Sequence, residues 1–180
     1  KHIPDITNWN VSNVTDMSYM FFFTEFNEYI GNWNVSNVTN MCGMFYGCQR
    51  FDQDIGNWNV GKVTNMECMF DECYYFNQYI GDWNVSNVSN MSFMFHNTDF
   101  SQDILDWNVS NVTDMGYMFS GSRFMKDISE WDINKNTDTT HMFSSISEYT
   151  NGMIDKNYMP IFTIEQLIDI KLDQNNLLLI

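Results

Sequence analysis

The sequence predicts an α/β solenoid, a right-handed coil of about six turns, and two observations lead to this prediction. Tryptophan recurs every 24 or 25 residues, at Trp9, Trp33, Trp58, Trp83, Trp107 and Trp131. Most of these tryptophans stand in nearly the same phrase, of which "NWNVSNVTNMCGMF" at residues 32–45 is one copy. A fixed period of this length is the signature of stacked repeats. We therefore expect residues 1–143 to form the solenoid, with one Trp marking each turn.

The first element expected in each turn is a short strand around the tryptophan. An Ile lies three residues before each Trp, and a Val or Ile lies two residues after it, as in Ile30, Trp33 and Val35. This phrase matches the Leu-x-x-Leu-x-Leu spacing of leucine-rich repeats, whose last positions alternate as a strand does. The alternation predicts that Trp faces the core in an internal stack, its indole N–H bonded nearby, while its two neighbours face outward.

The second element expected in each turn is a short helix. A second Val and a Thr or Ser precede a Met-x-x-Met-Phe cluster, such as Met41, Met44 and Phe45. The i, i+3, i+4 spacing is helical, and the hydroxyl just ahead of it is a good N-cap. A further Phe, such as Phe51, anchors the return to the next strand. Each turn is thus predicted to hold one strand, a tight turn and one short helix.

One such unit cannot fold alone, which explains why the phrase is repeated. About eight apolar side chains, worth ~1.5–3 kcal/mol each when buried, oppose an ordering cost of ~1.5 kcal/mol per residue. Stacking lets each turn bury its faces on its neighbours. The sixth copy is degraded at Asn136 and Thr139, so residues 144–180 are expected to be a C-terminal capping segment. No similar cap precedes Ile6, which predicts missing upstream repeats or self-association through the N-terminal end.

Composition and motifs narrow the classes of function. The net charge is -15, with 8 Lys+Arg against 23 Asp+Glu, so no basic stripe is available for DNA, RNA or anionic lipid. The sequence contains no run of about 18 apolar residues, which a membrane-spanning helix would need. We therefore expect a soluble chain. The histidines, His2, His96 and His141, fall in unrelated turns without a nucleophile or paired-carboxylate motif. We therefore expect no enzyme and no cofactor.

Two stretches resemble a known family. "DQDIGNWNVGKVTNMECMF" and "MFYGCQRFDQDIGNWNV" are similar to the BspA-like leucine-rich repeats of the Asn-Val-rich subtype, found in bacterial surface proteins, in lipoproteins and in large DNA viruses. The resemblance covers roughly residues 5–143. It implies a leucine-rich-repeat-like solenoid that acts in adhesion or protein recognition at a cell or particle surface. The alternative is an intracellular, virus-encoded scaffold that captures a basic host protein in the host cytoplasm.

The expected partner-binding surface is the outward face beside the tryptophans. This face is rich in amides at first and turns acidic in its second half, and two tyrosines join it. The residues expected to contact a protein partner are Asn32, Asn34, Asn57, Asn59, Asp82, Asn84, Asp106, Asn108, Glu130, Asp132, Tyr29 and Tyr79.

The acidic part of this face has two interpretations. Asp82, Asp106 and Glu130 would stack at ~4.8 Å per strand step, and opposed like charges invite a cation. The three, joined by Asp103 and Asp127, are therefore a candidate site for Ca²⁺ or for a basic patch on a partner. Ca²⁺ needs six or more converging oxygens, and no known loop motif is present. A solvated acidic face without a metal is thus favoured over the calcium site.

Cys48 and Cys73 both lie fifteen residues after a Trp, so they should be neighbours in successive turns. Two buried thiols are the favoured interpretation. A disulfide is the main alternative if the chain is extracellular. Zinc is the least favoured, because the spacing of these residues from Cys42 and Cys68 differs from the usual Cys-x2-Cys.

Overall fold

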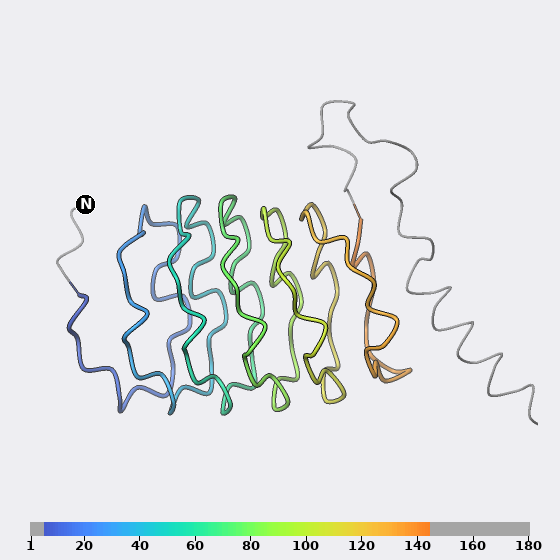
Figure 1. Cartoon of the computed structure of the whole chain (residues 1–180), viewed down its shortest axis with the longest axis horizontal. Coiled ribbons are helices and arrows are strands. Elements are labelled where there is room, and N and C mark those ends of the chain that lie inside the picture. The colour runs from blue at the N-terminus through green and yellow to red at the C-terminus, as the bar shows by residue number, and fades with distance from the viewer. Residues whose placement is uncertain (1–5, 145–180) are drawn as a thin grey trace, which may run out of the picture.

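The chain winds through a row of turns that lie side by side along one axis (Figure 1). This computed structural model describes residues 6–144. Isolated parallel bridges join equivalent residues of successive turns, at Asp16–Asn40, Asn40–Asn65, Asn65–Asn90, Asn90–Asp114 and Asp114–Asp138. Successive bridge residues are 24 or 25 positions apart, which is the tryptophan period. The repeat in the sequence is therefore a repeat in space.

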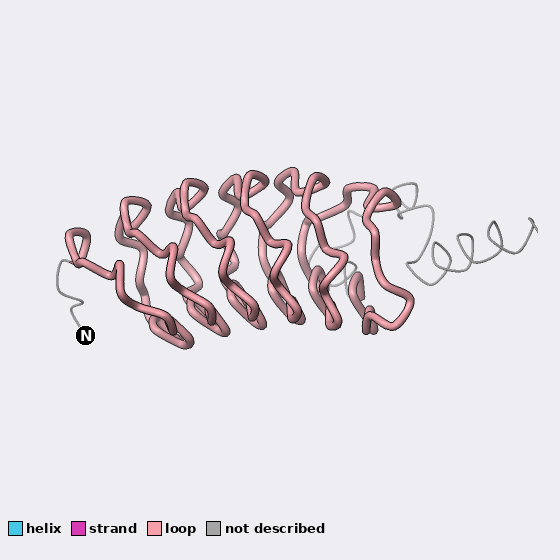
Figure 2. The backbone as a smooth tube through the Cα atoms, turned by 90° about the horizontal axis from the view of Figure 1, so that it is seen from below, coloured by secondary structure: helices cyan, strands magenta, loops and turns pink. Residues whose placement is uncertain are grey.

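Residues 6–144 include no strand longer than these single bridges and no helix (Figure 2). Around Trp33, where a strand was expected, the chain makes tight turns in which Trp33 N–H donates to the Ile30 carbonyl at 3.0 Å. Such turns use backbone groups that a strand would offer to its neighbours. The predicted alternation of side chains is nevertheless present, since Trp33 and Val35 are buried and Asn32 and Asn34 are exposed.

The Met-x-x-Met-Phe segment also differs from the helix expected there. Gly43 and Gly47 have φ values of 57° and 72°, and an α-helix requires negative φ throughout. The result is a series of tight turns, in which Met44 N–H donates to the Met41 carbonyl at 3.1 Å. The Thr39 hydroxyl does not cap a helix, because it donates to the Thr15 carbonyl of the preceding turn at 3.1 Å.

Backbone hydrogen bonds join the turns in both directions. In the Met segment, alternate N–H groups donate to the following turn, as from Met41 to the Asn65 carbonyl and from Gly43 to the Glu67 carbonyl, at 3.0 and 2.7 Å. At the threonine the direction reverses, and Thr64 N–H donates to the Thr39 carbonyl at 2.9 Å. Each interior turn therefore donates to both neighbours and accepts from both.

The core is built on two columns of phenylalanines. Within a turn, Phe45 and Phe51 stack with ring centroids 3.9 Å apart, and Phe45 lies 5.6 Å from Phe70 of the next turn. Each tryptophan from Trp33 on packs beside the phenylalanine of the preceding turn, as Trp58 does on Phe45 at 6.3 Å. The indoles therefore do not form the stack on one another that was expected.

The tryptophan N–H groups find acceptors in the preceding turn, as predicted. Trp58 Nε1 donates to the Ile30 carbonyl at 3.1 Å, and Trp83 Nε1 to the Ile55 carbonyl at 3.2 Å. Trp9 differs because no described turn precedes it, and its side chain is 51% exposed against 3% for Trp58.

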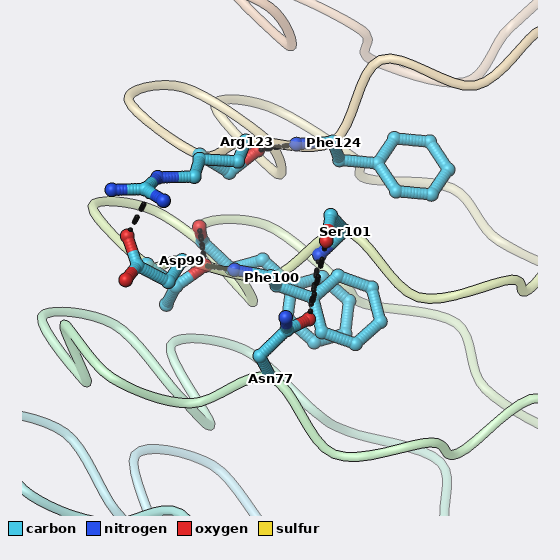
Figure 3. A network of polar contacts seen from close by, with 9 residues as sticks. Asn77, Asp99, Phe100, Ser101, Arg123 and Phe124 are labelled. Carbon is cyan, nitrogen blue, oxygen red and sulfur yellow. Dashed lines mark hydrogen bonds and ion pairs between the residues drawn. The ribbon is translucent and has the colours of Figure 1, made fainter. Parts of the chain in front are cut away.

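Polar side chains complete the contacts between turns (Figure 3). Asn77 Oδ1 accepts the Ser101 N–H at 3.0 Å, and one turn later Arg123 Nε lies 2.9 Å from Asp99 Oδ1. Among residues 6–144, no buried side-chain nitrogen or oxygen lacks a partner. The interior of the stack is thus fully bonded, which favours one fixed arrangement of the turns.

The predicted capping segment, residues 144–180, lies outside the described residues except for Ser144. Within the described range no helix is long and apolar enough to cross a bilayer.

Candidate functional site

The residue directly before each tryptophan belongs to what we call the outer row: Asn8, Asn32, Asn57, Asp82, Asp106 and Glu130. All six side chains are exposed. Asp82 accepts a hydrogen bond from the Tyr79 hydroxyl at 3.2 Å. No side-chain hydrogen bond or ion pair is formed by the other five within the described turns. Apart from Asp82, the outer row is positioned by the fold without use of its polar atoms.

The residues directly after the tryptophans are exposed as predicted, but most of them have a structural role. Asn34 Oδ1 accepts from the Ser36 N–H at 3.2 Å and from the Ser36 hydroxyl at 2.7 Å. Asn59, Asn84 and Asn108 close their turns by the same kind of bond. This is an Asx turn, and the spacing of Asn and Ser in the sequence is typical of it. Asp132 is exposed and forms no such bond in the structure.

The two tyrosines of the predicted surface are half exposed and held in place. The rings of Tyr29 and Tyr79 cover Gly31 and Gly81, where an added Cβ would lie 2.8 Å from a ring carbon. Loss of hydration, and then the nearby carboxylates led by Asp82, raise the pKa of Tyr79. Tyr79 therefore lies within the negative field of the acidic part of the surface.

The acidic side chains do not converge on a metal site. Asp82, Asp106 and Glu130 all face solvent. Asp103 and Asp127 each accept the backbone N–H two residues on, at 3.1 and 2.9 Å, and this bond lowers the pKa of Asp127. In the part of the chain that the structure describes, no three His, Cys, Asp or Glu side chains are grouped to hold a metal ion.

All four cysteines are free. Cys48 and Cys73 are buried, and their thiols donate to the carbonyls of Phe21 and Phe45 in the preceding turns, at 2.8 and 2.9 Å. Burial raises the pKa of both thiols. The two residues match the buried-thiol interpretation, and no disulfide joins them.

The structure brings together one cluster that the sequence analysis missed. His96 Nδ1 lies 2.7 Å from Oδ1 of the buried Asp71. These residues occupy the same position in successive turns, so counting from each Trp would have paired them. Burial, and then the charges of Asp71 and Glu67, raise the pKa of the neighbouring Cys68 to about 12. A cysteine nucleophile must be a thiolate, so Cys68 is an inert thiol at neutral pH.

Left-handed backbone recurs ten and fourteen residues after Trp in the first five turns, and ten residues after Trp131 in the sixth. Gly43, Gly47 and Gly121 occupy some of these positions. Elsewhere the positive φ is adopted by other residues, including four bulky aromatic ones: Tyr19, Phe23, Phe93 and Tyr117. Bulky side chains are uncommon in this conformation, but its recurrence at equivalent positions with Cys68, Glu72 and Asn97 indicates that the backbone of the repeat imposes it.

Comparison with known proteins places the chain in a family. Residues 1–99 and 78–169 both match the family described as Mycoplasma protein of unknown function, DUF285. The chain belongs to this family. The match also supports the resemblance to BspA-like repeats at the level of a related repeat family. No curated protein matches the chain, and no solved structure matches it.

Proposed function

We propose that this member of the DUF285 family is a non-catalytic protein-binding module, displayed on a cell or particle surface for adhesion. We further propose that its architecture is a leucine-rich-repeat-like solenoid of the BspA-like, Asn-Val-rich subtype. The single observation that carries the function is the outer row, a line of exposed polar side chains along six turns, of which only Asp82 is bonded within the described turns.

Rigid presentation supports this function. Every interior turn is bonded to both neighbours through its backbone, so the backbone that carries the outer row is ordered before any partner arrives. A preorganised surface avoids much of the entropy cost of binding. Such a surface suits recognition of a folded partner over an extended area.

Charge indicates what kind of partner the surface fits. The outer row is amide from Asn32 to Asn57 and acidic from Asp82 to Glu130. Tyr79 adds an aromatic ring beside the acidic part. Complementary charge steers association and rejects partners of the same sign. A protein with a basic patch is therefore the partner class that this surface favours.

Adhesion of coated beads to cultured host cells tests the proposal. Beads that carry the chain should adhere, and trypsin treatment of the cells should abolish the adhesion. The variant D82N/D106N/E130Q should lower adhesion roughly tenfold, which corresponds to ~1.4 kcal/mol of lost charge complementarity. Added salt should weaken adhesion in the same way, because it screens exposed charges.

A matched control removes as much charge elsewhere. The variant E28Q/D114N/D138N changes three carboxylates outside the outer row and should adhere as the unmodified chain does, since Asn already stands at the position of Asp114 and Asp138 in other turns. Equal adhesion by the outer-row variant and the control would contradict the proposal. Antibody labelling of intact cells that make the protein tests the location, since labelling only after permeabilisation would favour the intracellular scaffold.

A further inference from the structure

The first described turn carries exposed aromatic rings on its outer side. Tyr19, Phe22 and Phe23 are 52%, 45% and 55% exposed. Phe22 and Phe23 pack edge to face at 4.8 Å, and each lies close to Tyr46 of the next turn, at 5.3 and 5.1 Å. We call these four residues the first-turn aromatic patch.

The repeat does not need this patch in order to fold. At the positions of Tyr19 and Phe23, the second turn has Gly43 and Gly47. The position of Phe22 is filled by Tyr46 in the second turn and by polar residues in the later ones: Asp71, His96, Ser120 and Ser144. No other turn has aromatic side chains at all three of these positions, yet the other turns form the same backbone.

The patch also has an energetic cost for the folded state. Tyr19 and Phe23 adopt φ values of 54° and 50°, and a left-handed conformation costs a non-glycine residue ~1–2 kcal/mol. Exposed rings add apolar surface that contributes little to the core. Phe93 and Tyr117 adopt the same conformation in other turns, so the exposure of Tyr19 and Phe23, and not their strain, distinguishes the first turn.

The second turn makes room for the rings. Tyr19 lies against Gly43, and its hydroxyl oxygen accepts the Cys42 thiol at 3.3 Å. The Phe23 ring lies where a Cβ on Gly47 would come within 2.8 Å of it. The rings are therefore held in fixed positions at the surface, as a preorganised binding site requires.

Carboxylates border the patch. The charge of Glu67 acts on Tyr19, and those of Asp71 and Glu72 act on Tyr46, where they add to the effect of burial in raising its pKa. The nearby cation Arg50 is paired with Glu25 at 3.4 Å. The surroundings of the rings are thus apolar and negatively charged. Anionic lipid would be repelled by such a border.

We propose that the first-turn aromatic patch is the anchor site for a protein partner, and that it takes an apolar side chain flanked by Lys or Arg. The inference rests on the proposed binding function and names a second contact for the same partner. Aromatic rings contribute most of the binding energy when they fill the centre of an interface. Basic flanking residues are complementary to Glu67 and Glu72 at the border.

Selection from a random peptide library displayed on phage tests this inference. The immobilised chain should enrich peptides with Phe, Trp or Leu next to Lys or Arg. The patch variant Y19G/F22S/F23G, which takes residues that the repeat uses in other turns, should bind the enriched peptide at least roughly tenfold more weakly in fluorescence anisotropy. The control F93G/Y117G removes two aromatic rings of the same backbone conformation elsewhere and should bind normally.

The variants also separate binding from folding. If the triple variant does not fold, F22S alone changes an exposed ring at a position without positive φ and should still weaken the peptide. Enrichment of acidic peptides, or equal binding by the patch variant, would overturn the inference. Patch-dependent binding to phosphatidylserine vesicles, or patch-dependent self-association in sedimentation without peptide, would also overturn it, in favour of a membrane or a second copy.

Bead adhesion with both variants distinguishes the two proposals. Adhesion lost in D82N/D106N/E130Q and kept in the patch variant would leave the proposed function standing and remove the anchor site. Adhesion lost in both variants supports both proposals. Adhesion unchanged in both contradicts both.

Discussion

The first and third turns have nearly the same inner residues and opposite outer ones. The same inner residue, tryptophan, is 51% exposed in the first turn (Trp9) and 3% exposed in the third (Trp58). On the outer side, the first turn has Tyr19, Phe22 and Phe23, and the third has Cys68, Asp71 and Glu72. The repeated phrase determines the interior of a turn, and the outer positions are free to differ. Specific function is therefore to be sought where equivalent turns disagree.

The largest expected difference between the turns is in the phenylalanines. F70A removes a fully buried ring that stacks on Phe76 at 3.9 Å, and it should lower the free energy of unfolding by ~3–5 kcal/mol. F22A removes a half-exposed ring of the first turn and should cost less than ~1 kcal/mol. Urea unfolding of the two variants measures both values. Similar losses would show that the first-turn ring is a core residue.

The tryptophans should show a smaller difference. W58F removes the Nε1–H that donates to the Ile30 carbonyl at 3.1 Å and leaves a smaller ring in a buried site, so it should cost ~1–3 kcal/mol, although that carbonyl keeps the bond from the Trp33 N–H. W9F should be nearly neutral, since the Trp9 side chain is half exposed. Thermal unfolding compares them. A large loss in W9F would mean that this indole is covered in solution.

The left-handed positions allow a test in which a side chain is added to the second turn and removed from the first. G47A places a Cβ at φ 72° and 2.8 Å from the Phe23 ring, so it should destabilise the chain by at least ~1–2 kcal/mol. G61A, at a glycine without positive φ, is the control and should change stability by less than ~0.5 kcal/mol. F23G relieves the same strain in the first turn, so its stability should be unchanged or higher. A marked loss in F23G would show that the ring serves the fold.

The smallest effect concerns the buried thiols and is expected only in alkali. The first turn has Thr24 where the second and third have Cys48 and Cys73, whose pKa values burial raises above the ordinary 9.0. Above that pH the unfolded chain loses thiol protons that the folded chain keeps, so stability falls as pH rises. C48T/C73T should therefore fall less steeply above pH 9 and match the parent near pH 7. Identical alkaline slopes would contradict the assignment of the loss to these thiols.

The sequence was sufficient to predict the period, the inward residues and the exposed neighbours of each tryptophan. It was misleading about the Met segment, for a physical reason. Left-handed residues recur four positions apart, as at Gly43 and Gly47, so repeated tight turns space Met41, Met44 and Phe45 as a helix would. Glycine signals this geometry in the second turn, but Tyr19 and Phe93 adopt it without any such signal.

The sequence predicted where the candidate surface lies, but it predicted only part of what the residues of that surface do. Exposure follows from alternation beside the buried indole, and it holds for every residue proposed. The use of Asn34 and its equivalents to close turns depends on hydrogen bonds to residues two positions on, which outward orientation alone does not reveal. The pairing of His96 with Asp71 depends on stacking of successive turns. It could be found from the sequence only by comparing residues at equal distances from successive tryptophans.

The bonds between turns run along the axis of the stack (Figure 1), and this has a mechanical consequence. A pull on the two ends of the described stack would load the successive ladders in series, so the weakest would open first and the rest would stay closed. Each opened turn would release 24 or 25 residues, or ~80 Å of extended chain. The stack would therefore lengthen step by step under load while its remaining turns stayed folded.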